Sequence, residues 1–160
     1  MNTEGVSPPQ KVQEKILSRV FQDLHPSAWK VFAKLSLVHF GVGTLTLSLC
    51  PQFGVRFFGE GLGLMKLFSL LGSHGCMAAC GAFFVGMTLL LASLFLKTEE
   101  VKKLRASSPL QISALVLISL GAFIMADAQI LLVFALSWSV GSLIGGYVML
   151  EIGWWLKSHP

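Results

Sequence analysis

Charged residues are scarce in this sequence. They make up 12% of the 160 residues, whereas apolar residues make up 54%. This charged share is about half of what is usual in a soluble globular domain. The length is enough for one domain. The composition therefore argues against an ordinary soluble domain and indicates a chain that lies in a lipid bilayer.

The motifs of common enzyme classes are also missing. The sequence has no HExxH metal-binding motif, no phosphate-binding loop, no plausible Ser-His-Asp grouping and no paired carboxylates within an apolar run. The net charge is +4, but the interleaved basic and aromatic residues of a nucleic-acid surface are absent. The sequence therefore leans away from an enzyme, and we expect no nucleic-acid partner.

Four long apolar runs are present instead. They cover about 31–50, 76–96, 110–126 and 130–150, and each is close to the roughly 20 residues that cross a bilayer as a helix. An unbroken helix over the last two runs would be about 60 Å long, twice the thickness of the hydrocarbon core. The chain must therefore turn at its only polar point, around Asp127. We predict an all-α integral membrane protein with four transmembrane helices in a compact bundle.

The basic residues are distributed unevenly around these runs. Ten of the 12 Lys and Arg residues lie before or at the start of the first run, between the second and third runs, or after the fourth; the exceptions are Arg56 and Lys66. Lys and Arg accumulate on the cytoplasmic side of membrane proteins. We therefore expect both termini to be cytoplasmic, with 51–75 and Asp127 facing outward, in a bacterial inner (plasma) membrane.

Residues 1–26 are expected to form a cytoplasmic tail ahead of a membrane domain over 27–160. In the tail, apolar residues recur at helical spacing among charged ones, which predicts an amphipathic helix of about 14 residues. Ser27 suits the N-cap of the first transmembrane helix. We expect the amphipathic helix to lie on the inner membrane surface, with docking of a cytoplasmic partner as the alternative.

The predicted outward segment is rich in Gly and Phe between 51 and 63. It is too apolar for a freely solvated loop, so we expect it to lie in the interface or to dip back between helices that cover its backbone. The stretch from 64 to 96 is too long for one straight perpendicular span. A tilt or an outer overhang is expected there.

The three cysteines fall at the predicted outer ends of two spans. Cys50 ends the first run, while Cys76 and Cys80 are four residues apart and share a helix face. A short connection favours contact between the two spans, which would bring Cys50 to the other two. Thiolates select soft ions such as Cu(I) and Zn²⁺. We therefore name these cysteines as candidate metal ligands, with His74 and His39 as further candidates.

Two other interpretations of the cysteines stay open. In the first, they are small apolar residues that let helices pack closely. In the second, they exchange disulfides, with Cys50 and Cys76 forming the bridge and Cys80 left free. His74 is two residues from Cys76, so it points to another side of a regular helix.

His39 lies about 16 Å below Cys50 along the first span, near the middle of the bilayer. An ionisable residue at that depth is a functional candidate, here for proton relay or metal transfer. The alternative is a neutral imidazole that is hydrogen-bonded to Ser or Thr residues of the bundle.

Three further residues have predicted structural roles in the last two spans. Gly141 and Gly145 form a small-xxx-small pattern, which predicts close helix packing within the bundle or against a second copy. Asp127 is expected to mark the outward turn and to cap the fourth helix, where a carboxylate satisfies free amide groups.

These features predict a small multi-pass membrane protein. They do not indicate the biological process in which it takes part. The specific function that we favour is an outward-facing thiol site that binds a soft metal ion, Cu or Zn, for handling or transport. A bundle of this size is expected to act as a homo-oligomer or within a larger membrane complex. The alternatives are a non-catalytic membrane subunit or regulator that binds a protein partner, and an outward-facing thiol redox protein.

Overall fold

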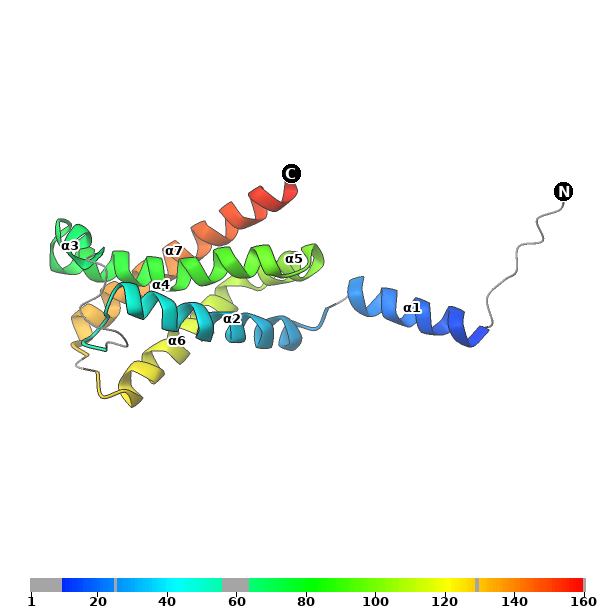
Figure 1. Ribbon diagram of the computed structural model, residues 1–160, viewed down its shortest axis with the longest axis horizontal. Helices are drawn as coiled ribbons and strands as arrows, with labels where there is room; N and C mark the ends of the chain where they lie inside the picture. Colours follow the sequence, from blue (N-terminus) through cyan, green and yellow to red (C-terminus); the bar gives the residue numbers. More distant parts are fainter. Residues whose placement is uncertain (1–9, 25, 56–63, 129, 160) are drawn as a thin grey trace.

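The computed structural model describes residues 10–24, 26–55, 64–128 and 130–159, and these residues form helices joined by short turns (Figure 1). In chain order the helices are α1 (Gln10–Leu24), α2 (Ala28–Leu49), α3 (Leu64–Ser69), α4 (Gly72–Phe95), α5 (Thr98–Ala106), α6 (Ser108–Met125) and α7 (Leu132–Ser158). The described residues contain no β-strand.

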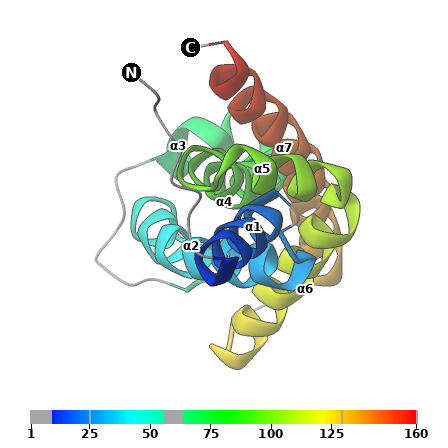
Figure 2. The ribbon, with the colours of Figure 1, turned by 90° about the vertical axis from the view of Figure 1, so that its right-hand side faces the viewer.

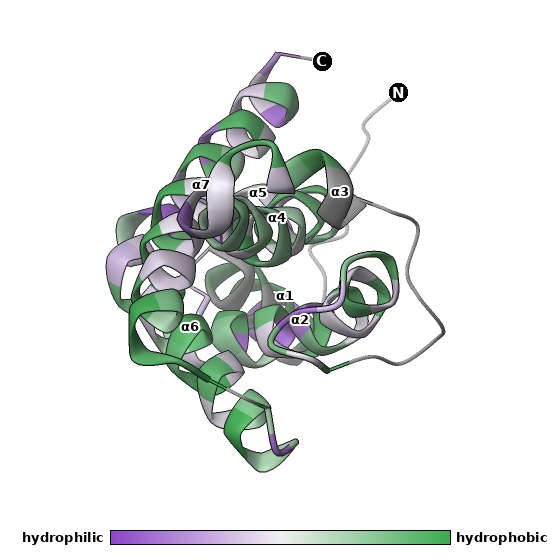
Figure 3. Ribbon diagram, turned by 90° about the vertical axis from the view of Figure 1, so that its left-hand side faces the viewer, coloured by the Kyte–Doolittle hydropathy of each residue, from purple (hydrophilic) through white to green (hydrophobic). Residues whose placement is uncertain are grey.

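Four of the helices, α2, α4, α6 and α7, are long and apolar enough to cross a membrane. They pack against one another, and α4 makes its most extensive contacts with α7 and α2 (Figure 2). Most of their residues are hydrophobic (Figure 3). The predicted all-α membrane bundle is confirmed, and the chain is a multi-pass membrane protein whose apolar helices face lipid.

The first span begins where the sequence predicts. Ser27 is the N-cap residue of α2, and its side chain accepts a hydrogen bond from the Lys30 amide at 3.3 Å. The predicted N-terminal helix is present as α1, which extends away from the bundle beyond the start of α2 (Figures 1 and 2). Its apolar residues are exposed, namely Val12, Ile16, Leu17, Val20 and Phe21.

The stretch from 64 to 96 is broken rather than tilted as a single span. The chain leaves α3 at Ser69 and re-enters a helix at Gly72, whose φ of +76° is a conformation that glycine adopts without steric cost. The short α3 then packs against α4, with the rings of Phe68 and Phe83 6.4 Å apart.

The turn between α6 and α7 lies at Asp127, as predicted, but Asp127 does not cap α7. Asp127 adopts a φ of +55°, its amide donates to Ile124 O at 3.1 Å, and the Ala128 amide donates to Phe123 O at 3.0 Å. This pair of hydrogen bonds is the Schellman motif, which closes the C-terminus of α6. The N-cap residue of α7 is Leu131, so the expected role of Asp127 at that helix is wrong.

Small residues let the backbones of α4 and α7 touch. Gly141 lies against the backbone of Ala78, and a Cβ atom built on Gly145 would be 2.5 Å from the Cβ of Ala82. Gly81 of α4 in turn faces the backbone of Trp138. The close packing that the glycine pattern predicts is therefore made within the bundle, and it leaves no room for larger side chains at these positions.

Charged residues tie the helices together at the opposite end of the bundle from Cys50. The buried Glu100 carboxylate pairs with Lys34 of α2 and accepts a hydrogen bond from the Lys97 amide at 2.9 Å, which starts α5. Arg105 of α5 pairs with Glu151 of α7 at 2.7 Å. The segment between the second and third apolar runs thus forms the helix α5, whose first turn is closed by the bond from the Lys97 amide to Glu100.

The α4–α7 contact predicts a large difference between two glycine substitutions. Gly141→Ala should lower the free energy of unfolding by about 1–3 kcal/mol, because the new methyl group overlaps the Ala78 backbone. Gly121→Ala on α6 is the matched control, since its Cβ would meet nothing within 4 Å. Thermal unfolding of both variants in detergent micelles measures the difference, and equal melting temperatures would contradict the packing.

The Glu100 pair predicts acid sensitivity. Burial raises the pKa of Glu100, but hydrogen bonds from Lys34 and the Lys97 amide outweigh it and hold the pKa below its ordinary value. The carboxylate therefore stabilises the fold above the ordinary carboxyl pKa of about 4.3, and this contribution is lost as the pH falls through the lower folded-state value.

We expect Glu100→Gln to reduce stability at pH 7 by about 1–3 kcal/mol and to flatten the fall in melting temperature between about pH 5 and pH 3. Glu99→Gln is the control, because Glu99 makes only an exposed pair with Lys102. A Glu100→Gln protein with the same pH profile as the unmodified chain would show that the pair contributes nothing.

Candidate thiol site

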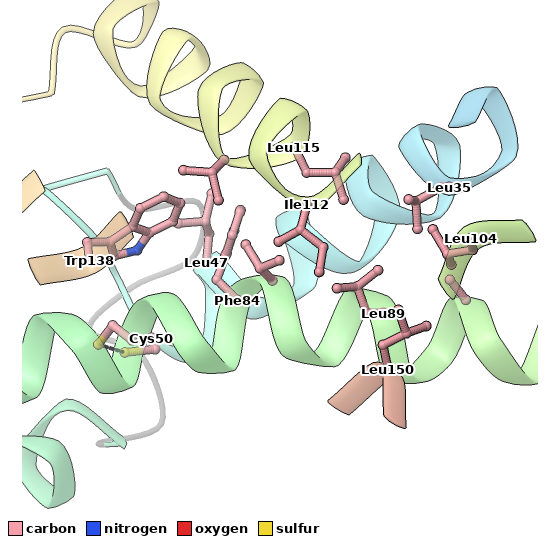
Figure 4. Packing of buried hydrophobic residues seen from close by; sticks show 14 of the residues in the cluster. Leu35, Leu47, Cys50, Phe84, Leu89, Leu104, Ile112, Leu115, Trp138 and Leu150 are labelled. Atoms are coloured by element: carbon pink, nitrogen blue, oxygen red, sulfur yellow. Dashed lines mark hydrogen bonds between the residues drawn. The ribbon is translucent and has the colours of Figure 1, made fainter. Parts of the chain in front are cut away.

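Cys50 stands at the point where α2 stops. Its amide donates to Thr46 O at 2.8 Å, and its backbone is extended, which ends the helix before Pro51. Because Pro51 disfavours helical geometry in the residue before it, the sequence itself fixes this stop. The Cys50 side chain is fully buried within the bundle (Figure 4).

The sulfur of Cys50 meets that of Cys80. The two Sγ atoms are 3.3 Å apart, and Cys80 is buried as completely as Cys50. Cys76 lies one turn before Cys80 on the same face of α4 and is also buried. The expected contact between the first two spans is therefore present, and Cys80 rather than Cys76 is the residue whose sulfur Cys50 contacts.

The chain after Cys50 folds back into the bundle. Phe53 and Gly54 have φ values of +50° and +81°, and the Val55 amide donates to Gln52 O at 2.9 Å. Positive φ at both central positions is the pattern of a type I′ turn. Over 51–55 the apolar segment thus dips back between the helices. This is one of the two placements that the sequence predicts for it. The remainder of the segment, 56–63, lies outside the described residues.

Gln52 links this turn to two transmembrane helices. Its Nε2 donates to the backbone oxygen of Cys80 at 3.3 Å, and its Oε1 accepts a hydrogen bond from Trp138 Nε1 at 2.7 Å. Gln52 and Trp138 are both essentially inaccessible to solvent. A buried amide is costly unless it is paired, so these two bonds hold the turn, α4 and α7 in one arrangement around the thiols.

Aromatic rings form a packed cluster around Phe53, in the turn that follows Cys50. Phe53 packs on Phe123 at 5.3 Å and on Trp138 at 6.0 Å between ring centroids, and Phe84 packs on both of these partners at 5.8 Å. The left-handed backbone of Phe53 is strained for a bulky residue. Burial of its ring in this cluster offsets that strain.

The two histidine candidates lie elsewhere. The exposed His74 Nδ1 is 3.2 Å from Ser137 Oγ on α7. In His39, Nδ1 is 2.9 Å from Thr88 Oγ1 and Nε2 is 2.8 Å from Ser119 Oγ. His39 is therefore hydrogen-bonded to Thr and Ser hydroxyl groups of the bundle, as the alternative to a functional role predicted. These hydroxyl groups come from α4 and α6. The described residues contain no group of three or more His, Cys, Asp or Glu side chains placed to hold a metal ion.

The thiol site is thus a pair of sulfur atoms. Their separation of 3.3 Å can be compared with the sulfur–sulfur distance at a metal ion and with that in a disulfide. An ion with sulfur bonds of about 2.3 Å and an S–M–S angle of 120° needs sulfurs about 4.0 Å apart, so the pair would open by about 0.7 Å. A disulfide needs about 2.05 Å, so the pair would close by about 1.3 Å. Accommodating an ion requires the smaller displacement.

Gln52 was not identified as a site residue from the sequence. Its only signal is its position two residues after a helix-terminating cysteine, in a segment that is otherwise apolar. A polar side chain in such a segment needs a buried partner, which points to the bundle interior. The partner itself, Trp138, lies 86 positions away in the chain, and only the packing of α7 on α4 brings it there.

Removing the Gln52 amide should loosen the thiol end of the bundle. We expect Gln52→Leu to lower the free energy of unfolding by about 1–3 kcal/mol, because it leaves the Trp138 indole N–H buried without an acceptor. In Trp138→Phe, which lacks that N–H, the further substitution of Gln52 should cost less. A double-mutant cycle on thermal unfolding measures the coupling, and additive losses would contradict a shared hydrogen bond.

The chain matches no protein-family model, no curated protein and no solved structure at a significant level. No relative therefore contributes to its functional assignment. Among the described residues, the two sulfur atoms at the end of α2 and in α4 are the chemical feature to be explained.

Proposed function

We propose that the thiol site binds a soft metal ion, for handling or transport across the membrane that the bundle occupies. The observation that carries the proposal is the 3.3 Å approach of Cys50 Sγ to Cys80 Sγ at the end of two transmembrane helices. Cys76, one turn away on α4, would complete a three-thiolate set by rotation of its side chain. Cys76 is buried on the same face of α4 as Cys80, four positions before it.

The ligand set favours Cu(I) over Zn²⁺. Structural zinc sites use four ligands, whereas Cu(I) is stable with two or three sulfurs. The neighbouring Gln52 offers no further ligand, because its Oε1 accepts from Trp138 and its Nε2 is a donor.

In our proposal, the charge distribution decides which side of the membrane the thiol site faces. The basic residues gather at the end of the bundle that carries α5, which favours the cytoplasm for that end and for both termini. The thiol site would then face outward from a bacterial inner membrane. A path for an ion through so small a bundle calls for a second copy of the chain or a larger membrane complex.

Metal analysis tests the proposal directly. Protein purified anaerobically with reductant and loaded with Cu(I) should retain about one copper per chain by mass spectrometry. Cys50→Ser and Cys80→Ser should lose it, because each removes one sulfur of the contacting pair. Cys76→Ser should bind more weakly. His74→Ala is the control and should bind normally, since that histidine contacts α7 instead.

The same preparation separates the competing functions. Absence of copper in the unmodified protein would contradict the proposal. Thiols that react with a label only after reduction would then favour the redox function, through a bridge between Cys50 and Cys80. Three freely reacting thiols without copper would leave the cysteines a packing role in a membrane subunit or regulator.

A further inference from the structure

A groove runs between α2 and α6 at the middle of the bundle. Its volume is about 310 Å³, and α4 forms its floor through Phe84. Figure 1 shows that α6 is inclined to α2, and this divergence leaves the space between them. Apolar side chains form most of its walls, and they include Phe40, Leu115, Ile118, Ala122 and Phe123.

The groove opens toward lipid near the middle of the bilayer. Phe40 is 79% exposed and Ile118 is 51% exposed, so the rim faces outward from two transmembrane helices. His39, which also lines the groove, lies halfway along α2. The lining continues from there to Val55 and Ala126 at the thiol end of the bundle. A ligand would therefore enter sideways from the hydrocarbon and extend along the groove toward that end.

Two serine hydroxyl groups, of Ser36 and Ser119, lie in the otherwise apolar lining near His39. Ser36 Oγ is buried and has no hydrogen-bond partner among the described residues. Ser36 lines the groove one helical turn before His39, and Ser119 lines it from the α6 side. An unpaired hydroxyl in an apolar setting is costly, which indicates that this wall is complementary to a hydrogen-bonding ligand.

The His39 network can supply a second donor when two of its hydroxyl groups rotate. When Nε2 carries the ring proton it donates to Ser119 Oγ, and the Thr88 hydroxyl, which otherwise donates to Phe84 O at 3.1 Å, turns to donate to Nδ1. The Ser119 hydroxyl, which otherwise donates to Leu115 O at 2.7 Å, is then free to turn its hydrogen toward a ligand. The Leu115 carbonyl remains within its helix, where a backbone amide already serves it.

We propose that this groove binds an uncharged, membrane-dissolved molecule with a planar ring and carbonyl oxygens, of the quinone class. Three observations specify the ligand. Phenylalanine rings from α2, α4 and α6 suit a flat ring, the two serine hydroxyls suit oxygen acceptors, and none of the described lining residues is charged. This site does not depend on metal binding by the cysteines.

Quenching of tryptophan fluorescence by decylubiquinone, a short-chain quinone, tests the proposal on the full chain in nanodiscs. The unmodified protein should show saturable quenching beyond that caused by partition into lipid. Ala122→Phe should fill the groove and weaken binding at least tenfold. Ser36→Ala should weaken it about fivefold through one lost hydrogen bond. Leu117→Phe, on the exposed face of α6 away from the groove, should bind normally.

Quenching that rises without saturation, or equally in all four proteins, would overturn the proposal. So would a tightly co-purifying phospholipid in the groove, or cross-linking through Ile118→Cys that joins two copies of the chain there. The Ser36→Ala variant keeps the shape of the groove, so its result stands even where Ala122→Phe disturbs folding.

Discussion

The contact between the backbones of α4 and α7 is the constraint on which the thiol site depends. Gly141 lies on the Ala78 backbone and Gly81 on that of Trp138, so α7 approaches α4 closely along this interface. That approach places the Trp138 indole within reach of Gln52. Gln52 then holds the turn after α2 against Cys80, and Cys50 at the start of that turn meets the Cys80 sulfur.

The two ends of the bundle satisfy their buried polar groups in different ways. At the thiol end, neutral hydrogen bonds among Gln52, Trp138 and the Cys80 carbonyl satisfy buried groups without any charge. At the other end, Lys157 donates to the carbonyl oxygens of Ser93 and Leu96 and so closes the C-terminus of α4. A cation there is favourable, whereas the hydrogen bonds of Gln52 at the thiol end involve no charged group.

Local and periodic signals made much of this structure predictable. Hydrophobic runs of bilayer length gave the four spans, Ser27 supplied a side-chain cap, and the small-residue pattern at Gly141 and Gly145 indicated a close helix contact. These features depend on residues that are near one another in sequence. The positions of Cys50 and Cys80 near the ends of neighbouring spans could be predicted from the sequence for the same reason.

Features that depend on distant partners or on backbone conformation were not predictable. The role of Gln52 requires Trp138, and the partners of His39 come from two other helices. Asp127 ends α6 in a left-handed conformation rather than capping α7, and an N-cap signal in sequence does not distinguish the two. Whether Cys76 or Cys80 meets Cys50 depends on the rotation of α4, which its contact with α7 fixes.

X-ray absorption spectroscopy at the copper edge of the loaded protein tests the central claim most directly, because it counts the atoms bound to the ion. The account predicts two or three sulfur neighbours at about 2.3 Å and no nitrogen neighbour, since neither His39 nor His74 lies with the thiol pair. A first shell of nitrogen or oxygen atoms would contradict the assignment of Cys50 and Cys80 as the metal ligands.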